Sequence, residues 1–352
     1  MKWLVAGLTH RELGVEFTEA VELLGGIPPE QLREFQEALL SGEGKSVVYS
    51  NPELSVIDSA EPGGALLRSL VFNARPNLVQ TAVLVDAAGN VDNSRPPPIE
   101  GGSATHLQGL SLGMALHSLH SAAGRGTAHS TVSPRVCVLG AGGCSLPAHL
   151  LLTIPGATID AVELSPAVLA AARDFFGVGA LEAEHPRSRF AVHCACAASW
   201  IAARSSRKDE QPPPYDVIIV DIEGGGQDGD EAEELVAPPR AFLSPDFLGN
   251  VRRSLAPGGI VAMNVVGTPA AAQSALQAVG DGWPLHSHAL CKAPSTGDGM
   301  HYILFSCDGD IASGAELQAA LAAAESPLVD DGAAWVKGYR RASLGTDVAA
   351  LF

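Results

Sequence analysis

Two groups of residues, 23 positions apart, have the types needed to hold a nucleotide. The first is the glycine-rich run Gly140-Ala-Gly-Gly143, which directly follows the apolar segment Val136–Leu139. The second is Glu163, which ends the apolar segment Ile159–Val162. Glycine lets the backbone approach a ligand closely. A carboxylate at the tip of the neighbouring strand can accept hydrogen bonds from both ribose hydroxyls. The spacing therefore predicts a nucleotide site at a strand–turn–helix junction.

The residues of the glycine turn indicate which class of nucleotide it can bind. A dinucleotide-binding turn has a third glycine where this chain has Ser145, so NAD is disfavoured. The G-K-[ST] ending of a phosphate-binding P-loop is also missing. A glycine turn in some other α/β fold remains an alternative interpretation.

A third candidate is Asp221, which ends the apolar segment Tyr215–Val220. In open α/β sheets, ligands bind at the carboxyl edge, where the strand order reverses. Asp221 is therefore a candidate catalytic residue that holds either the amino group of a bound ligand or an incoming amine. The alternative for Asp221 is a loop cap. We interpret the nearby Glu223 as a solvated loop acid, while either acid could orient the amine or accept its proton.

The elements that must position these residues alternate between strand and helix. This rhythm predicts a parallel sheet covered on both faces, closed by an antiparallel hairpin because Lys292–Met300 is too short for a helix. The fold class is α/β, a Rossmann-like seven-stranded mostly parallel sheet with an antiparallel edge hairpin. The expected strands are 135–139, 158–163, 190–193, 215–221, 260–266, 286–291 and 301–307, and the expected helices are 146–152, 166–176, 244–255 and 269–279.

The region before this sheet has a different character. Ile27–Leu40 has helical spacing, and the leucine-rich residues 106–120 resemble a second helix. Four short apolar runs between them predict a small antiparallel sheet: 46–49, 54–57, 66–72 and 78–85. The small polar residues of 124–133 mark a linker, so we expect an N-terminal helical and small β region over 1–128 and a second domain over 129–352.

Composition limits the partners. The chain has 352 residues, 46% of them apolar, and a net charge of −17. This is a folded globular chain whose negative surface disfavours nucleic acid as a partner and suits a basic protein or a cationic small molecule. The six cysteines include no C-x-x-C pair and several lie in apolar runs, which indicates reduced, buried thiols. No apolar segment has the length of a signal peptide or a membrane span, so we expect a cytoplasmic protein.

A metal site is not expected. Cys194 and Cys196 share one face of a strand, beside His193. A structural zinc ion needs four ligands, and the sequence has no second cluster of ligand residues.

Several stretches resemble the spermidine synthase-like branch of the class I methyltransferases. Within it, they are most similar to the C-terminal domain of the family that methylates lysines and the N-terminus of eukaryotic elongation factor 1-alpha. Together these stretches cover most of residues 135–266, and the Gly-Gly-x-Ser-Leu-Pro turn is more specific than a generic glycine loop. The matching stretches are Val138–Pro147, Ile159–Pro166, Phe175–Val178, Tyr215–Asp221, Pro238–Phe242, Phe247-Leu248 and Leu255–Asn264.

The resemblance implies an S-adenosyl-L-methionine-dependent methyltransferase that acts on an amine, at a lysine or an N-terminus, of a protein substrate. It implies that Gly140 and Gly142 lie at the methionine end of the cofactor, Glu163 at its ribose and Asp221 at the catalytic edge. The full candidate set of cofactor-binding residues is Gly140, Ala141, Gly142, Glu163, Leu164, Cys196, Ala197 and Asp221.

The sequence departs from the family at Cys196, where the relatives have an aspartate that accepts the adenine amino group. A thiol accepts a hydrogen bond poorly, and one lost bond weakens binding by about 1–3 kcal/mol. Either backbone amides compensate for this loss or the site is degenerate.

Two other functions stay open. A polyamine aminopropyltransferase has a similar fold and a strand-rich N-terminal segment. However, Cys144 stands where those enzymes have an acid, and Ile222-Glu-Gly lacks their second aspartate and proline. A catalytically degenerate binding protein of the same fold is the third interpretation. A homodimer through the edge of the 46–86 sheet is also an expectation.

Overall fold

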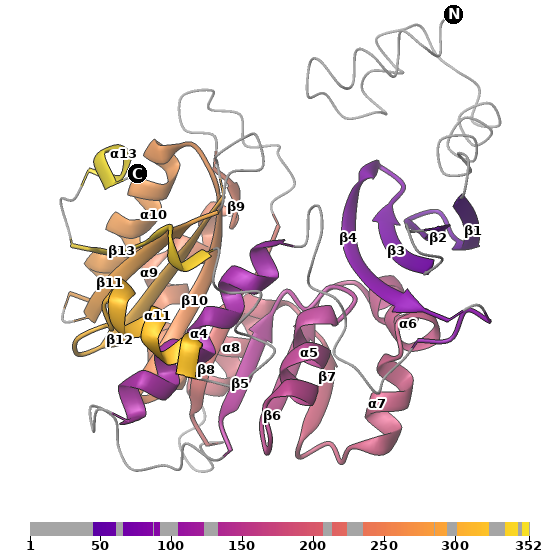
Figure 1. Cartoon of the computed structure of the whole chain (residues 1–352), viewed down its shortest axis with the longest axis horizontal. Coiled ribbons are helices and arrows are strands. Elements are labelled where there is room, and N and C mark those ends of the chain that lie inside the picture. The colour runs from indigo at the N-terminus through magenta and orange to yellow at the C-terminus, as the bar shows by residue number, and fades with distance from the viewer. Residues whose placement is uncertain are drawn as a thin grey trace, which may run out of the picture.

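The computed structural model describes residues 45–60, 66–86, 88–91, 105–122, 133–206, 213–223, 235–284, 286–293, 301–323, 335–343 and 347–351. The helix expected over Ile27–Leu40 and the domain boundary expected at 128/129 lie outside these residues. Within them the chain forms a small antiparallel sheet followed by a large, mostly parallel sheet with helices on both faces (Figure 1).

The small sheet has the order β1-β2-β3-β4, and each strand is antiparallel to the next. It confirms the four strands expected from the short apolar runs. Its strands are β1 (Lys45–Ser50), β2 (Leu54–Ala60), β3 (Leu66–Phe72) and β4 (Arg75–Val85).

The large sheet contains nine strands within the described ranges, in the order β13-β11-β12-β10-β8-β5-β6-β7, with β9 pairing with β10. β10, β8, β5, β6 and β7 run parallel, so their carboxyl ends share one edge of the sheet. β12 is antiparallel to both β10 and β11. The strands are β5 (Arg135–Leu139), β6 (Thr158–Glu163), β7 (Phe190–Cys194), β8 (Tyr215–Val220), β9 (Leu235–Ala237), β10 (Leu255–Gly267), β11 (His286–Lys292), β12 (His301–Asp308) and β13 (Tyr339–Ala342).

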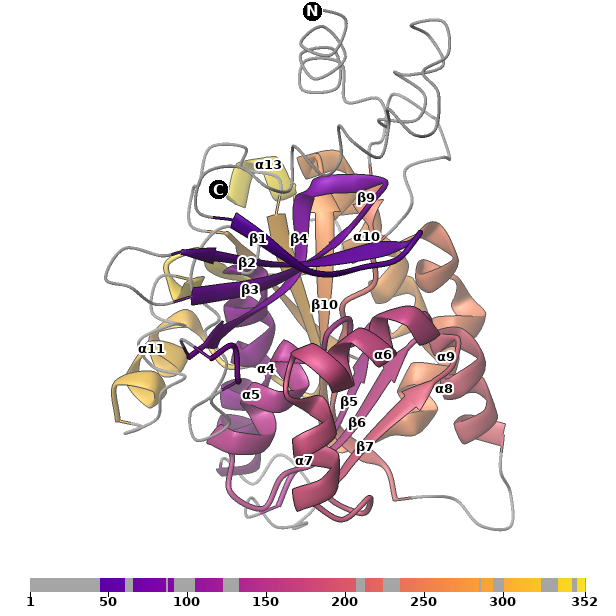
Figure 2. The same ribbon diagram turned by 90° about the vertical axis from the view of Figure 1, so that its right-hand side faces the viewer.

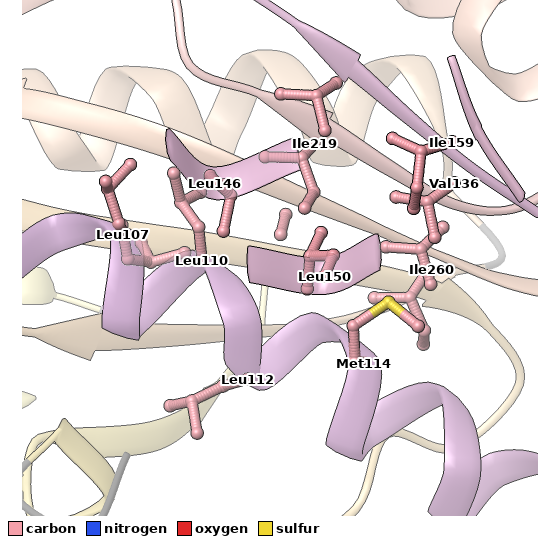
Figure 3. Close-up of a cluster of buried hydrophobic side chains, with 14 of the residues drawn as sticks. Leu107, Leu110, Leu112, Met114, Val136, Leu146, Leu150, Ile159, Ile219 and Ile260 are labelled. Atoms are coloured by element: carbon pink, nitrogen blue, oxygen red, sulfur yellow. The ribbon is translucent and has the colours of Figure 1, made fainter. Parts of the chain in front are cut away.

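The central strands are buried on both faces, which is why they read as continuous apolar runs. In β5, Val136 and Val138 pack with α4 (Thr105–Ala122) and α5 (Ser145–Thr153), while Cys137 and Leu139 face the opposite layer. Figure 3 shows side chains of α4 and α5 gathered with those of the strands. Burying each such aliphatic side chain contributes about 1.5–3 kcal/mol.

The helices form two layers around the large sheet. On the α4 and α5 side lie α7 (Val178–Glu184) and α11 (Gly314–Ala323). On the other side lie α8 (Ala197–Ser206), α9 (Pro245–Ser254), α10 (Pro269–Gly282) and α13 (Val348–Leu351). The short 3-10 helix η2 (Arg240–Leu243) precedes α9. Ser244 caps α9 by accepting a hydrogen bond from the Phe247 amide, as its sequence predicts.

The helix α6 (Pro166–Phe175) joins the two sheets. Its residues Leu169 and Ala172 pack into the core of the large sheet, whereas Val168 and Ala171 pack against the small sheet. Figure 2 shows the small sheet above α6. The small sheet is therefore docked on the large domain through a shared helix.

The expected fold class is confirmed, with additions at the edges. All seven expected strands are present and adjacent, and β9 and β13 add two more. The predicted β11/β12 hairpin is present, but β13 covers β11, so the hairpin is not the outermost pair. Helices α7, α8, α11 and α13 and the 3-10 helix η2 were not expected. The six cysteines are all free; Cys194 and Cys196 are exposed, which corrects the expectation that the thiols are buried.

Candidate functional site

The glycine turn between β5 and α5 lies at the carboxyl edge of the large sheet. Gly140 has a φ of +86°, and a Cβ there would lie 2.0 Å from the backbone oxygen of Asp221. Position 140 must therefore be a glycine, because any side chain there would overlap the backbone that follows β8. Gly142 differs: its φ is +52°, but a Cβ would meet only the Gln80 oxygen, 4.0 Å away, among described atoms. The open space beside Gly142 is where a ligand can approach the backbone.

Glu163 reaches from the end of β6 to this turn. Its Oε2 accepts a hydrogen bond from the Gly142 amide at 2.9 Å, and its Oε1 accepts one from the Ser165 amide at 2.8 Å. The carboxylate is thus held in one orientation by two backbone donors. Each oxygen keeps a second lone pair that can accept a further hydrogen bond.

Next to Glu163, two exposed side chains lie at the tips of β6 and β7. These are Leu164, which is 67% exposed and thus unusual for a leucine, and Cys196. The next residue, Ala197, is buried at the start of α8. Cys196 precedes α8 and is exposed. A hydrogen bond from the Ser199 amide lowers the pKa of the Cys196 thiol, against the opposing effect of partial burial. The sulfur therefore occupies a helix N-cap position, where aspartate is favoured.

Asp221 directly follows β8 and is surrounded by groups from three other elements. Asn264 of β10 donates to its Oδ1 at 2.9 Å, and the His106 Nε2 of α4 lies 3.2 Å from its Oδ2. The His106 ring stacks on His301 of β12, with ring centroids 5.3 Å apart. Burial raises the pKa of Asp221, but the charge and hydrogen bond of His106 and the hydrogen bond of Asn264 outweigh it, so the pKa is lowered.

Glu223 behaves differently from Asp221 although it is only two residues away. Its surface is exposed, yet neighbouring atoms partly desolvate the carboxyl and this raises its pKa. The hydrogen bond from Gln80 Nε2 at 3.3 Å lowers the pKa, whereas the negative charge of Asp221 raises it further. The expectation of a simple solvated loop acid is therefore incomplete.

The small sheet supplies one wall of this region through β4. Besides the Gln80–Glu223 contact, Thr81 Oγ1 lies 2.6 Å from Ser145 Oγ of α5. A Cβ on Gly143 would lie 2.3 Å from the Thr81 methyl carbon, so the third glycine of the run permits this close contact. β4 therefore packs directly against the glycine turn.

The structure brings together one part of the predicted set and adds residues to it. The Gly142 amide donates to the Glu163 carboxylate, the Gly140 and Ala141 amides donate to the Val162 oxygen just before Glu163, and Gly140 lies against the Asp221 backbone oxygen. Sequence reasoning missed Gln80, His106, Asn264 and His301. A polar residue inside the apolar run Ile260–Val266 was the one available signal, for Asn264.

Neither a metal centre nor a membrane segment is found among the residues that the structure describes. No group of three or more His, Cys, Asp or Glu side chains there could hold a metal ion. None of the described helices combines the length and the apolar character that crossing a bilayer requires.

Comparison with known proteins finds sequence relatives that share one name. The human eEF1A lysine and N-terminal methyltransferase is 34% identical over 129 residues, which cover 37% of this chain and 17% of that protein. A homologue from Drosophila pseudoobscura pseudoobscura is 26% identical over 212 residues, which cover 60% of this chain and 29% of the relative. The chain thus spans less than a third of these relatives. No protein-family model matches it.

The fold also has a solved counterpart. A probable spermidine synthase from Corynebacterium glutamicum ATCC 13032 superposes with a TM-score of 0.56 at 17% identity, over 79% of this chain and 88% of that one. The resemblance to the elongation-factor methyltransferases and to the spermidine synthase-like fold is therefore confirmed.

Proposed function

We propose that this chain is a cytoplasmic S-adenosyl-L-methionine-dependent methyltransferase that acts on an amine, at a lysine or an N-terminus, of a protein. Residues 129–352 form its methyltransferase domain, and residues 1–128 form the region before it. The observation that carries the proposal is the convergence at one sheet edge of the Gly142 backbone, the oriented carboxylate of Glu163 and the polar cluster around Asp221. The names of the sequence relatives support the same reaction.

The residues fit an adenosyl-methionine ligand in most respects. The space beside Gly142 suits the methionine end, with Gly140 and Ala141 completing the turn. The lone pairs left on Glu163 suit the two ribose hydroxyls. Exposed Leu164 offers an apolar surface to the adenine, between Glu163 and the Cys196–Ala197 segment. Cys196 is the poorer fit, because its thiol is a weaker acceptor than a carboxylate.

When bound, the cofactor supplies a methyl group that is already activated by a sulfonium sulfur. The protein must then align a neutral amine and exclude water. Asp221 is held by His106 and Asn264 and stays ionised, so it binds and orients the acceptor ammonium. Glu223 has the raised pKa, and its carboxylate accepts the ammonium proton before transfer.

The proposed acceptor is a protein with a basic or free-amine segment. The net charge of −17 favours such a partner electrostatically and disfavours nucleic acid, and no membrane partner is proposed. The sequence relatives are named as methyltransferases of eEF1A, so eEF1A is the first acceptor to test.

We also propose a homodimer through β1. This strand is exposed along its length, with Val47 at 40%, Val48 at 39% and Tyr49 at 38% exposure. Its outer edge has no pairing strand among the described residues, and such an edge is a template for pairing. Sedimentation analysis tests this: a monomer at all concentrations contradicts it.

The first experiment is calorimetric titration with S-adenosylmethionine, S-adenosylhomocysteine and decarboxylated S-adenosylmethionine, followed by methyl transfer to eEF1A. Micromolar binding of the first two, weakened at least tenfold by Glu163→Ala, supports the proposal. Unchanged affinity in Glu163→Ala contradicts the ribose role.

Two alternative functions are each favoured by one specific observation. The small antiparallel sheet before a spermidine synthase-like fold favours an aminopropyltransferase. Preference for the decarboxylated cofactor, with transfer to putrescine, would support it. The thiol of Cys196 favours a degenerate binding protein, and that function predicts no binding of any of the three ligands.

A further inference from the structure

Asp221 is the meeting point of three elements that are distant in sequence. The helix α4 packs across β10, β8 and β12, as Figure 1 shows. Its first turn carries His106 to Asp221, which is 115 residues away in the chain. β10 contributes Asn264, and the first residue of β12 is His301. The geometry of the Asp221 carboxylate is therefore set by groups outside β8.

Both oxygens of this carboxylate are engaged. Asn264, only 2% exposed, donates to Oδ1 at 2.9 Å, and His106 Nε2 lies 3.2 Å from Oδ2. The side chains of His106 and Asp221 are 15% and 13% exposed, so the pair is mostly shielded from water but still open to a ligand. Shielding strengthens the interaction between the two groups.

His106 is itself fixed in orientation. Its ring stacks on that of His301 with an angle of 14° between the planes. Burial lowers the pKa of His301 to about 4, with a further contribution from His106. At neutral pH the stacked partner is therefore uncharged, and the ring presents a flat, neutral surface to His106.

We propose that His106 is a positioning residue for the transfer reaction, which fixes the Asp221 carboxylate in one orientation and keeps it ionised for an ammonium acceptor. The inference rests on the proposed function, because it names a further residue of the same site. It assigns the acceptor-binding charge to a histidine–aspartate pair and not to Asp221 alone. His301 supports the pair by stacking.

Among the residues that the structure describes, three other titratable groups act on this pair or on its neighbour Glu223. From β12 it meets His301, from the segment after β8 it meets Glu223, and Arg75 of β4 acts on Glu223. His301 also lowers the pKa of Asp221, but its effect is smaller than those of His106 and Asn264, and Glu223 is acidic, so neither group replaces His106. Removing the imidazole therefore leaves burial as the dominant influence, and the pKa of Asp221 rises.

The test compares His106→Ala and His106→Gln in the full-length protein. The glutamine side chain keeps an N–H donor at a similar reach but has no charge. Ser118→Ala on the exposed side of the same helix is the matched control. Titration of selectively ¹³C-labelled aspartate by NMR reports the Asp221 carboxyl directly and needs no acceptor.

The expected result is an upward shift of the Asp221 pKa in His106→Ala, a smaller shift in His106→Gln and none in Ser118→Ala. With eEF1A as acceptor, kcat/KM of His106→Ala falls by roughly tenfold to a hundredfold, and the acid limb of its pH profile moves to higher pH. Calorimetric affinity for S-adenosylmethionine stays unchanged.

Two results overturn the inference. One is an Asp221 titration that is the same in His106→Ala and the parent protein. The other is a loss of kcat/KM that is equal at every pH and equal in His106→Gln. Failure of the proposed function looks different, because the parent protein then neither binds S-adenosylmethionine nor transfers methyl groups while the NMR titration still reports on the pair.

Discussion

At the scale of single residues, Cys196 is the position where this site differs from its expected pattern. Its sulfur lies at the N-cap of α8 and accepts from backbone amides there. An aspartate can make the same cap and still offer an oxygen to a ligand. The geometry that a carboxylate needs is therefore already present.

We predict that Cys196→Asp tightens binding of S-adenosylmethionine by roughly tenfold to a hundredfold, the equivalent of one added hydrogen bond of about 1–3 kcal/mol. Calorimetric titration measures it. The control is Cys194→Ser, at an exposed cysteine whose side chain contacts the Leu164 oxygen at 3.8 Å and caps no helix. Equal or weaker binding in Cys196→Asp would exclude an adenine contact at this position.

Residue types at the predicted site were visible in the sequence because they sit at strand ends. An apolar run followed by Gly140, and another followed by Glu163, mark the carboxyl edge of a parallel sheet. His106 could not be found this way. Nothing near it indicates a ligand, and its partner is 115 residues away. Long-range pairs of this kind depend on how α4 crosses the sheet.

At the scale of elements, the turn after β5 is constrained by the end of β8. The absent side chain of Gly140 leaves room for the Asp221 backbone oxygen, so the two strand ends can lie side by side. The same contact positions the residue that we propose as catalytic. The contact between Gly140 and Asp221 therefore affects both the stability of the protein and the position of the proposed catalytic residue.

We predict that Gly140→Ala lowers the free energy of unfolding by more than 2 kcal/mol, from left-handed backbone strain of about 1 kcal/mol plus a steric overlap. Gly142→Ala is the matched control, since it has positive φ without the overlap, and should cost about 1 kcal/mol. Urea denaturation compares them. If the two variants lose equal stability, the overlap is relieved by movement of β8.

The docking of the small sheet depends on a buried ion pair. Arg68 Nε lies 2.7 Å from Asp58 Oδ1, with the side chains 8% and 10% exposed. Arg68 also donates to the Phe175 oxygen at the end of α6, at 3.3 Å. The pair therefore links β2 and β3 to the helix shared by both sheets.

We predict that Asp58→Ala destabilises the protein by about 3–5 kcal/mol, because it leaves a buried guanidinium without its partner. The double variant Asp58→Leu/Arg68→Met should recover most of this loss, since an apolar pair carries no desolvation cost. Thermal unfolding distinguishes them. A double variant as unstable as the single one would show that the charge of Arg68 is needed for docking on α6.

The elements themselves were largely predictable, and the exceptions have physical causes. Strands buried on both faces are apolar runs in the sequence, and Ser244-Pro245 is a typical helix start that predicts α9. Helices α7 and α8 were missed because they are short or weakly amphipathic. β13 was missed because two of its four residues are exposed arginines, which a propensity argument assigns to a loop.

At the scale of the whole molecule, buried histidines make stability depend on pH. His149 of α5 is 2% exposed, and neither ring nitrogen has a hydrogen-bond partner among described atoms. Burial lowers its pKa to about 4. The folded state therefore keeps His149 neutral while the unfolded state binds a proton below about pH 6.5.

We predict that stability falls as pH decreases from 6.5 towards 4, because the unfolded chain binds more protons in this window. His149 contributes roughly 2 kcal/mol of this loss between pH 7 and pH 5. Urea denaturation of the parent protein and of His149→Leu at both pH values measures it. The variant should lose less stability on acidification; identical losses would mean that His149 is not the group responsible.

The strand order of the large sheet has a consequence for synthesis of the chain. Chains fold as they leave the ribosome, amino end first. β11 emerges before β12, yet in the finished sheet it pairs only with β12 and β13 among the described strands. The nascent protein therefore carries β11 without its β12 partner until residues 301–308 are made and insert between β11 and β10. His301 arrives with that same insertion, so the polar cluster around Asp221 is completed only when nearly all of the chain has been made.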